Sequence, residues 1–323
     1  QGFKDVLEIG REWRYDLFSL GLEMPSPIVP RNLRFEVTER VNFKGEIVKN
    51  LLEDELIKIA KIIEKSGVKT LAIVFLHSFK NSKNENLAKN VIQKELPDLN
   101  ICLSSVVSPE IGEYERTSTC VANAYVQPVF KNYVNSLVEG LKKIGISNDL
   151  FLMLSDGGIV HQKTAIEFPI RLVQSGPAGG AQAATLFGKM QKSMNILCFD
   201  MGGTTAKACL IEDSKPSRTT VFEVARVFRF SKGSGLPLQV PVVDMIEIGA
   251  GGGSIARIDN MGLIQVGPDS SSSYPGPACY DLGGELPTVT DSDLILGYID
   301  ADNFLGGDMK LSKKNAEYAI DKY

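Results

Sequence analysis

The sequence predicts an α/β protein, in which strands and helices alternate along the chain. Short apolar runs recur, amphipathic stretches with helical spacing separate them, and glycine or proline stands at several of the junctions. The 323 residues are enough for two domains of ordinary size, each with a core of its own.

The first half of the sequence predicts a hairpin and then alternating strands and helices. Period-2 patterning predicts a hairpin with its turn at residues 42–45. A helix over 53–65 places Leu56, Ile59, Ala60 and Ile63 on one face, and Gly67 ends it. Further elements are expected in this order: a strand at 70–76, a helix at 84–96, a strand at 101–107, a long helix from Thr117 or Ser118 towards Ile144 that Pro128 should kink or split, and a strand at 150–154.

The second half is expected to consist of strands joined by glycine-rich turns. The segment 175–187 predicts such a turn, followed by a helix of small residues. Strands at 196–199 and 205–211 flank the sequence DMGGT, which places Cys198 almost opposite Cys209. Further elements are a strand at 242–248, which leads into GAGGGS, and a short helix near 291–298.

The polar stretch at 191–195 indicates a domain boundary, because a new apolar strand begins directly after it. We expect a first α/β domain over 31–192 and a second over 193–323, which carries the DMGGT turn. Residues 1–30 are expected to be the tail of an upstream domain.

Charge and composition exclude several classes of protein. Lys+Arg 35 against Asp+Glu 39 gives a net charge of −4 without a dense basic cluster, which argues against a nucleic-acid or anionic-membrane partner. No apolar run reaches the roughly 18 residues that a membrane span needs. The 5 cysteines lack CxxC spacing and the 2 histidines stand far apart, which argues against a zinc site or a disulfide framework. We therefore expect a cytoplasmic protein whose partners are small molecules or proteins.

The sequence DMGGTT follows an apolar strand directly and predicts a phosphate-binding turn. Gly202 and Gly203 let the backbone turn tightly. The amides up to Thr205, with the hydroxyls of Thr204 and Thr205, supply hydrogen-bond donors. Asp200 ends the strand, where it can hold Mg²⁺ directly or through water. The alternative is a hairpin turn that binds no ligand.

Two more glycine-rich turns adjoin apolar elements. In SGPAGG, Gly176, Gly179 and Gly180 precede a helix whose N-terminus favours an anion, and close packing of small residues is the alternative. In GAGGGS a flexible hairpin turn is the alternative, and the candidate residues are Gly249, Gly251, Gly252, Gly253 and Ser254. The three turns together favour a nucleotide or phosphoryl site, although neither a GxGxxG fingerprint nor a Walker loop is present.

Other polar residues are weaker candidates. Glu113, Glu115 and Arg116 are expected at the surface near the start of the long helix. Asp291 is a candidate metal ligand or general acid, although capping a helix is the commoner use of such a residue. Cys279 is a conceivable nucleophile, but no histidine lies near it in the sequence and most single cysteines are inert.

Several strings, in order along the chain, resemble one family: YERTSTCVANAYVQP, LSDGG, RLVQSGPAGGAQAA, CFDMGGTTAK, IGAGGGSIARID, VGPDSSSSYPGPACY and PTVTDSDLILGYIDADNFLGG. They are similar to the A-type, ATP-binding subunit of the hydantoinase/oxoprolinase family over nearly the whole chain. The resemblance implies an α/β fold similar to that of actin and the sugar kinases (ribonuclease H-like), with mixed sheets flanked by helices. It also implies ATP-dependent opening of a cyclic amide, such as a hydantoin or 5-oxoproline, through phosphorylation of its carbonyl oxygen.

The resemblance also implies site residues, cofactors and partners. Asp200 would orient Mg²⁺ or water, residues 202–205 would hold phosphate, and 249–254 and 176–180 would line the nucleotide cleft. The implied cofactors are ATP and Mg²⁺. The implied partners are a small cyclic amide substrate and a B-type subunit, within an oligomer.

Two departures from the family pattern bear on function. Many members read DMGGTSTD where this chain reads DMGGTTAK, so Lys207 stands where an acid is common. Members also carry another DxGGT-type turn upstream of GFKDVLEIGR, the segment near which this sequence opens. We therefore expect the central fragment of a longer A-type subunit, with weak or no turnover by itself. The alternatives are an ATP-using subunit of an acetone-carboxylase-like enzyme and a non-catalytic nucleotide-binding scaffold.

Overall fold

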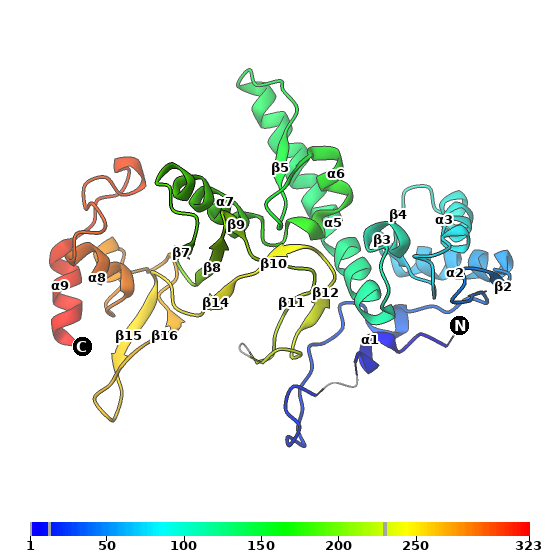
Figure 1. Ribbon diagram of the computed structural model, residues 1–323, viewed down its shortest axis with the longest axis horizontal. Helices are drawn as coiled ribbons and strands as arrows, with labels where there is room; N and C mark the ends of the chain where they lie inside the picture. Colours follow the sequence, from blue (N-terminus) through cyan, green and yellow to red (C-terminus); the bar gives the residue numbers. More distant parts are fainter. Residues whose placement is uncertain (1, 12–13, 229–230) are drawn as a thin grey trace. The chain divides into compact units, whose positions relative to one another are not determined.

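The chain folds into two compact units of mixed α/β structure, which a computed structural model describes for residues 2–11, 14–228 and 231–323 (Figure 1). The first unit comprises Gln1–Gly179 and Arg218–Val243, and the second comprises Gly180–Ser217 and Asp244–Tyr323. The units therefore interleave along the sequence. The domain division expected between residues 192 and 193 stays a prediction.

The first unit contains small sheets and several helices. Its elements in chain order are α1 (Val6–Ile9), the 3-10 helix η1 (Arg31–Leu33), β1 (Arg40–Val41), β2 (Ile47–Lys49), α2 (Glu53–Ser66), β3 (Thr70–Ile73), α3 (Lys83–Glu95), β4 (Asn100–Leu103), α4 (Ser104–Val107), α5 (Glu113–Lys143), β5 (Phe151–Met153), β6 (Ile159–His161), α6 (Gln162–Glu167), the 3-10 helix η2 (Pro169–Leu172), β10 (Arg218–Thr219), β11 (Phe222–Val224), β12 (Leu236–Leu238) and β13 (Val242–Val243).

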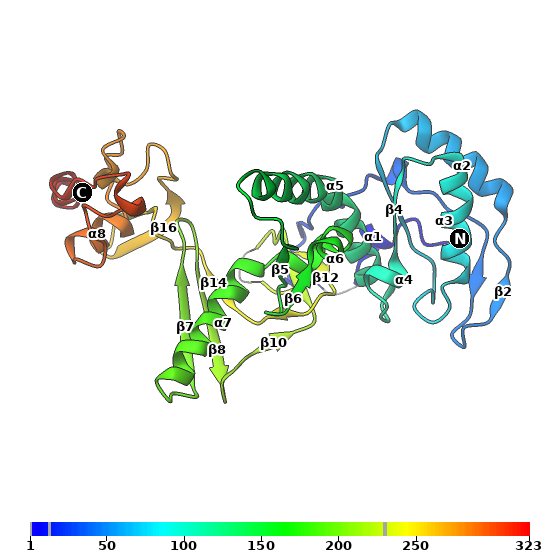
Figure 2. The same ribbon diagram turned by 90° about the horizontal axis from the view of Figure 1, so that it is seen from above.

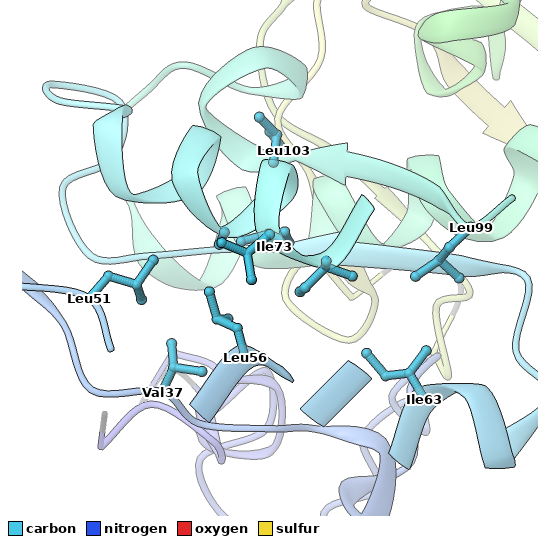
Figure 3. Close-up of a cluster of buried hydrophobic side chains, with 10 residues drawn as sticks. Val37, Leu51, Leu56, Ile63, Ile73, Leu99 and Leu103 are labelled. Atoms are coloured by element: carbon cyan, nitrogen blue, oxygen red, sulfur yellow. The ribbon is translucent and has the colours of Figure 1, made fainter. Parts of the chain in front are cut away.

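A parallel strand pair carries the main core of the first unit. β3 and β4 pair from Thr70 opposite Asn100 to Ile73 opposite Leu103. Side chains of α2 and α3 pack against this pair in one apolar cluster, part of which is labelled in Figure 3. The strand–helix–strand order predicted for this region is thus confirmed, because a parallel pair needs such a crossover.

Helix α2 follows its sequence pattern closely. Its first turn is acidic, which suits the positive end of the helix dipole. Leu56, Ala60 and Ile63 are buried as predicted, and Ile59 on the same face is partly buried. Gly67 takes a left-handed conformation with φ of 70° directly after the helix and donates its amide to the carbonyl oxygen of Glu64. Glycine adopts this conformation without strain, so it ends the helix where expected.

The strand predicted over 101–107 ends at Leu103, and the short helix α4 follows. The cause lies in α3, whose buried Glu85 carboxylate reaches the end of β4. It accepts hydrogen bonds from the Ser104 hydroxyl at 2.6 Å and the Ser105 amide at 2.9 Å. This contact between distant segments overrides the apolar strand pattern of the sequence.

Helix α5 begins four residues before Thr117, at Glu113, and continues through Pro128 as one helix, so Pro128 does not split it. A row of buried polar side chains in its first half ties it to the backbone of other segments. Arg116 donates to the carbonyl oxygen of Phe75 at 2.8 Å, and the Thr119 hydroxyl accepts from the Gln239 amide at 2.8 Å. The expectation that Arg116 lies at the surface is wrong, because its side chain is fully buried among these partners.

The second unit is built around one small antiparallel sheet. Its elements are most of α7 (Ser175–Met190), whose first residues belong to the first unit, then β7 (Ile196–Met201), β8 (Ala206–Glu212), β9 (Lys215–Pro216), β14 (Ile246–Ile248), β15 (Ser254–Ile258), β16 (Ile264–Ser270), the 3-10 helix η3 (Ala278–Tyr280), α8 (Val289–Ile295), the 3-10 helix η4 (Leu305–Gly307) and α9 (Lys313–Lys322).

The central strands of this sheet follow the order β14–β8–β7, and their two faces differ. Helix α7 runs beside β7 and β8 (Figure 2) and covers the face that carries Ile196, Cys198 and Asp200. Cys198 lies directly opposite Cys209, as predicted. The opposite face is apolar, and six of its side chains are at least 39% exposed: Leu197, Phe199, Met201, Leu210, Ile246 and Ile248.

The residues after β16 form a second apolar cluster within this unit. Its buried members are Cys279 in η3, Leu294 in α8, Leu311 just before α9 and Ala316 in α9. Of the helices formed by the described residues, none is both long and apolar enough to cross a membrane.

Candidate functional site

The DMGGTT sequence forms a tight, exposed turn between β7 and β8. The Gly202 amide donates to the carbonyl oxygen of Thr205 at 2.9 Å, which closes the turn. Within the described part of the chain, the amides of Gly203, Thr204 and Thr205 donate no hydrogen bond across the turn, and neither do the two threonine hydroxyls. Donors left free on an exposed turn are available to an anion such as phosphate.

The GAGGGS segment packs directly on this turn. The Gly252 amide donates to the carbonyl oxygen of Gly202 at 2.9 Å, and the Gly253 amide donates to that of Gly203 at 2.7 Å. The amide of Gly251, in the same segment, donates to the Ser254 hydroxyl at 2.9 Å. Since these amides are engaged, the segment holds the DMGGTT turn by the carbonyl oxygens of Gly202 and Gly203.

Glycine is required in this segment because the two backbones approach closely. A Cβ atom at Gly251 would lie 2.6 Å from the carbonyl oxygen of Gly202 and 2.6 Å from the Thr204 nitrogen. Both atoms belong to the backbone of the DMGGTT turn, so neither can rotate away. Gly249, at the start of the segment, turns its carbonyl oxygen towards Gly267.

The SGPAGG sequence lies inside helix α7 instead of forming a turn before it. Its glycines permit close packing of the helix. A Cβ atom at Gly179 would lie 3.2 Å from the Met153 sulfur, and one at Gly180 would lie 3.5 Å from the Asp200 carboxylate. Gly180 therefore lies beside Asp200, whereas Gly176 and Gly179 belong to the first compact unit.

Asp200 presents an uncommitted carboxylate beside the turn. In the part of the chain that the structure describes, this carboxylate accepts no hydrogen bond and forms no ion pair. Lys207 lies directly opposite it on β8, but the lysine Nζ lies 3.9 Å from the Glu247 carboxylate on β14. No group of three or more His, Cys, Asp or Glu side chains gathers to hold a metal ion among the described residues.

Comparisons with known proteins identify the family of this chain. The family model for Hydantoinase/oxoprolinase matches residues 116–323, and the model for the Hydantoinase/oxoprolinase N-terminal region matches residues 1–96. The chain belongs to the hydantoinase/oxoprolinase family. This hydantoinase/oxoprolinase chain is 43% identical to an uncharacterised protein of Methanocaldococcus jannaschii over 325 residues, which is 100% of the chain and 48% of that protein.

Two further relatives have described activities. The caprolactamase subunit alpha of Pseudomonas jessenii is 34% identical over 99% of the chain and 45% of its own length. The nucleotide-free structure of acetone carboxylase, described for ATP-dependent acetone carboxylation, has a TM-score of 0.72 and 28% identity over 100% of the chain and 46% of its own length. The expected α/β, actin-like fold is confirmed by this likeness. The hydantoinase/oxoprolinase chain spans less than half the length of these relatives.

Two segments of the hydantoinase/oxoprolinase chain that sequence reasoning left out also adjoin the site. The Thr290 amide donates to the carbonyl oxygen of Gly252 at 2.8 Å, and the Ser271 amide donates to that of Gly253 at 2.8 Å. The only sequence signal for these two contacts was the clustering of Ser and Thr in SSSS and TVTDSD. That signal is weak, because such residues are equally common in ordinary turns.

The structure gives Asp291 a structural use. Its carboxylate is fully buried and accepts from the Cys279 amide at 2.7 Å and from the Thr288 amide at 2.9 Å. The Thr288 hydroxyl accepts in return from the Asp291 amide, which completes a capping box at the start of α8. Every oxygen of this carboxylate is engaged, so the cap interpretation replaces a metal or acid role.

Cys279 is poorly suited to act as a nucleophile. Its thiol is fully buried, and this burial, together with the nearby Asp291 carboxylate, raises its pKa far above the ordinary value. A thiol attacks as the thiolate, which is not formed here near neutral pH.

Glu115 is also buried, contrary to the expectation that it lies at the surface. It pairs with Arg11 near the start of α5, so its carboxylate serves to anchor the N-terminal segment.

Proposed function

We propose that the second unit binds the phosphates of ATP at the turn formed by residues 202–205. The observation that carries this proposal is the set of free amides and hydroxyls on the turn, next to the uncommitted Asp200 carboxylate. The GAGGGS segment supports it by holding the carbonyl oxygens of the turn on the other side. A turn whose carbonyl oxygens are engaged and whose amides are free is suited to an anion.

The donor set also fits Mg²⁺. This ion prefers oxygen ligands and is commonly held by one or two carboxylates together with substrate phosphates and water. Asp200 supplies one such carboxylate, which no protein group competes for in the described chain. When bound, Mg²⁺ would neutralise phosphate charge. Asp200 would orient it, and the amides of Gly203 to Thr205 would hold the phosphate oxygens in place.

We propose that a full-length protein of this family that contains this chain opens a cyclic amide with the use of ATP. The amide carbonyl resists water because of its resonance, and phosphorylation of its oxygen removes that resonance, so that water can add to the carbon. The C–N bond then breaks as the nitrogen takes up a proton, which opens the ring and leaves an acyl phosphate. A second water hydrolyses the acyl phosphate and releases inorganic phosphate. The similarity to the caprolactamase subunit supports this choice, since caprolactam is a cyclic amide. The name of that relative, a subunit, supports a B-type partner subunit within an oligomer.

A carboxylase reaction is the second candidate, and the likeness to acetone carboxylase favours it. The phosphoryl acceptor would then be a ketone enol or bicarbonate. Phosphate release from the complete assembly distinguishes the two: stimulation by 5-oxoproline or a hydantoin supports the amide reaction, and stimulation by ketones supports the carboxylase. Stimulation by neither would favour a non-catalytic scaffold.

Calorimetric titration of Mg-ATP into the chain tests the nucleotide site. We expect saturable binding that weakens at least tenfold in the Asp200→Ala variant. Glu212→Ala is the matched control, because Glu212 is an exposed acid at the other end of β8 and should leave binding unchanged. Equal binding by Asp200→Ala and the parent chain would contradict the role of Asp200. Weak ATP turnover by the chain alone remains our expectation.

A further inference from the structure

Three charged side chains form a row across the sheet of the second unit. Asp200 on β7 lies opposite Lys207 on β8, and Lys207 lies opposite Glu247 on β14. Residues directly opposite each other in adjacent strands project from the same face. The single cation therefore stands between two acids on the face that carries Asp200.

Lys207 pairs with Glu247 and not with Asp200. Its Nζ lies 3.9 Å from the Glu247 carboxylate, and it forms no ion pair with Asp200 in the described part of the chain. The lysine side chain is 21% exposed and that of Glu247 is 44% exposed, so the pair lies at the edge of solvent. A flexible lysine stem with its three donors can reach either neighbour.

We propose that Glu247 is a positioning residue, which holds the Lys207 ammonium away from Asp200. The inference rests on the proposed nucleotide site. A carboxylate paired with a lysine is a weaker ligand for a divalent cation, because the cation must displace the ammonium. By engaging Lys207, Glu247 leaves the Asp200 carboxylate available to Mg²⁺ and keeps a positive charge near the phosphates.

A double-mutant cycle tests this arrangement, with Mg-ATP affinity as the measured quantity. In Glu247→Gln the lysine loses its partner and turns to Asp200, so we expect the affinity to fall about tenfold. In the Lys207→Met background the same change should alter affinity less than about threefold, because there is no ammonium to redirect. An equal loss in both backgrounds would mean that Glu247 acts through its own charge, and would overturn the proposal.

Crystal structures of the parent chain and Glu247→Gln provide a readout that needs no nucleotide. We expect Lys207 Nζ within about 4 Å of the Asp200 carboxylate only in the variant. A lysine that stays away from Asp200 in the variant would also overturn the proposal. If Lys207 moves to Asp200 in the variant but the parent chain binds no Mg-ATP, the result supports the positioning role of Glu247 and rejects the proposed nucleotide site. Glu212→Gln serves as the control and should change neither measurement.

Discussion

The amide of Gly253 donates a 2.7 Å hydrogen bond to the carbonyl oxygen of Gly203. With the neighbouring bond from Gly252 to Gly202, it interlocks the two glycine-rich segments of the second unit. The interlock orients the DMGGTT backbone: the carbonyl oxygens of Gly202 and Gly203 face GAGGGS, and the amides of Gly203 to Thr205 stay free of hydrogen bonds across the turn among the described residues. The two segments therefore have different tasks despite their similar composition.

Gly251→Ala should disrupt this interlock. The Cβ atom of the alanine would lie 2.6 Å from backbone atoms of Gly202 and Thr204 in the DMGGTT turn, so that turn must shift. We expect Mg-ATP affinity to fall at least tenfold, as measured by calorimetry, while far-UV circular dichroism shows an intact fold.

Gly140→Ala is the control for this change. Gly140 lies in α5, and nothing lies within 4 Å of a Cβ atom built there. Alanine should raise helix stability by up to about 1 kcal/mol and leave nucleotide binding unchanged. Unaltered binding in Gly251→Ala would show that the turn tolerates displacement.

Arg116→Met should destabilise the first unit strongly. The buried guanidinium donates to the carbonyl oxygen of Phe75 and to the hydroxyls of Ser78 and Ser104. Methionine leaves these groups without a donor, and we expect the free energy of unfolding to fall by about 3–5 kcal/mol. Urea unfolding followed by circular dichroism measures the change. The exposed Arg218→Met should stay within about 0.5 kcal/mol of the parent chain, and an equal effect of both changes would refute the role of burial.

Glu55 should contribute to stability in a pH-dependent manner. Hydrogen bonds from the Thr38 amide and hydroxyl, at 2.6 and 2.9 Å, lower its pKa below 4.5. A carboxyl whose pKa is lower in the folded state contributes stability above its unfolded pKa, and loses it as pH falls through the folded pKa. Glu55→Gln should therefore lower the thermal midpoint near pH 7, and the difference should close in acid below pH 4.5.

The control for Glu55 is Glu53→Gln, in the same turn of α2. It lacks the Thr38 contacts and keeps only its share of the helix-dipole interaction, so its difference from the parent chain near pH 7, and the convergence in acid, should both be smaller. A constant difference between Glu55→Gln and the parent chain from pH 7 down to strong acid would contradict the linkage.

Alkylation should distinguish the cysteines. Burial raises the pKa of Cys120 well above the ordinary value and also raises that of Cys279, and both side chains are fully buried. Cys198 is only partly buried. At pH 8, iodoacetamide should therefore label Cys198 first and leave Cys120 and Cys279 unlabelled until the chain unfolds. Peptide mass mapping gives the order, and early labelling of Cys279 would contradict its burial.

The apolar outer face of the central sheet should bind hydrophobic dyes. Leu197 and Leu210 lie opposite each other on this face and are 64% and 57% exposed. Changing both to threonine should reduce the fluorescence of bound anilinonaphthalene sulfonate while the fold persists, because threonine suits a strand. The exposed Leu263→Thr is a control outside this face and should change the signal little. Equal signals from the pair variant and the parent chain would mean that the face is covered in solution.

Local patterns predicted much of the fold. Three predictions are confirmed: the apolar spacing in α2, its end at Gly67, and the position of Cys198 opposite Cys209 in the strand register. Each of them depends only on neighbours within one element or one hairpin. The α/β class followed from the same patterns, whereas the actin-like expectation came from the family motifs.

Features that depend on distant segments were not predictable in this way. The strand expected through residue 107 becomes a helix because Glu85 captures Ser104 and Ser105. The same limit applies to the site. Sequence spacing indicated three glycine-rich turns, one of which lies inside α7 instead, but not that GAGGGS uses its amides to hold the DMGGTT turn.

The interlocked glycine segments also have a consequence for folding. Gly203 and Gly253 are far apart in sequence, and strands β8 and β14 must pair before their backbones can meet. Contacts of this kind form slowly, because the intervening chain must first be ordered. The ability to recognise a phosphate group should therefore appear late during refolding, after the hairpin of β7 and β8 has formed.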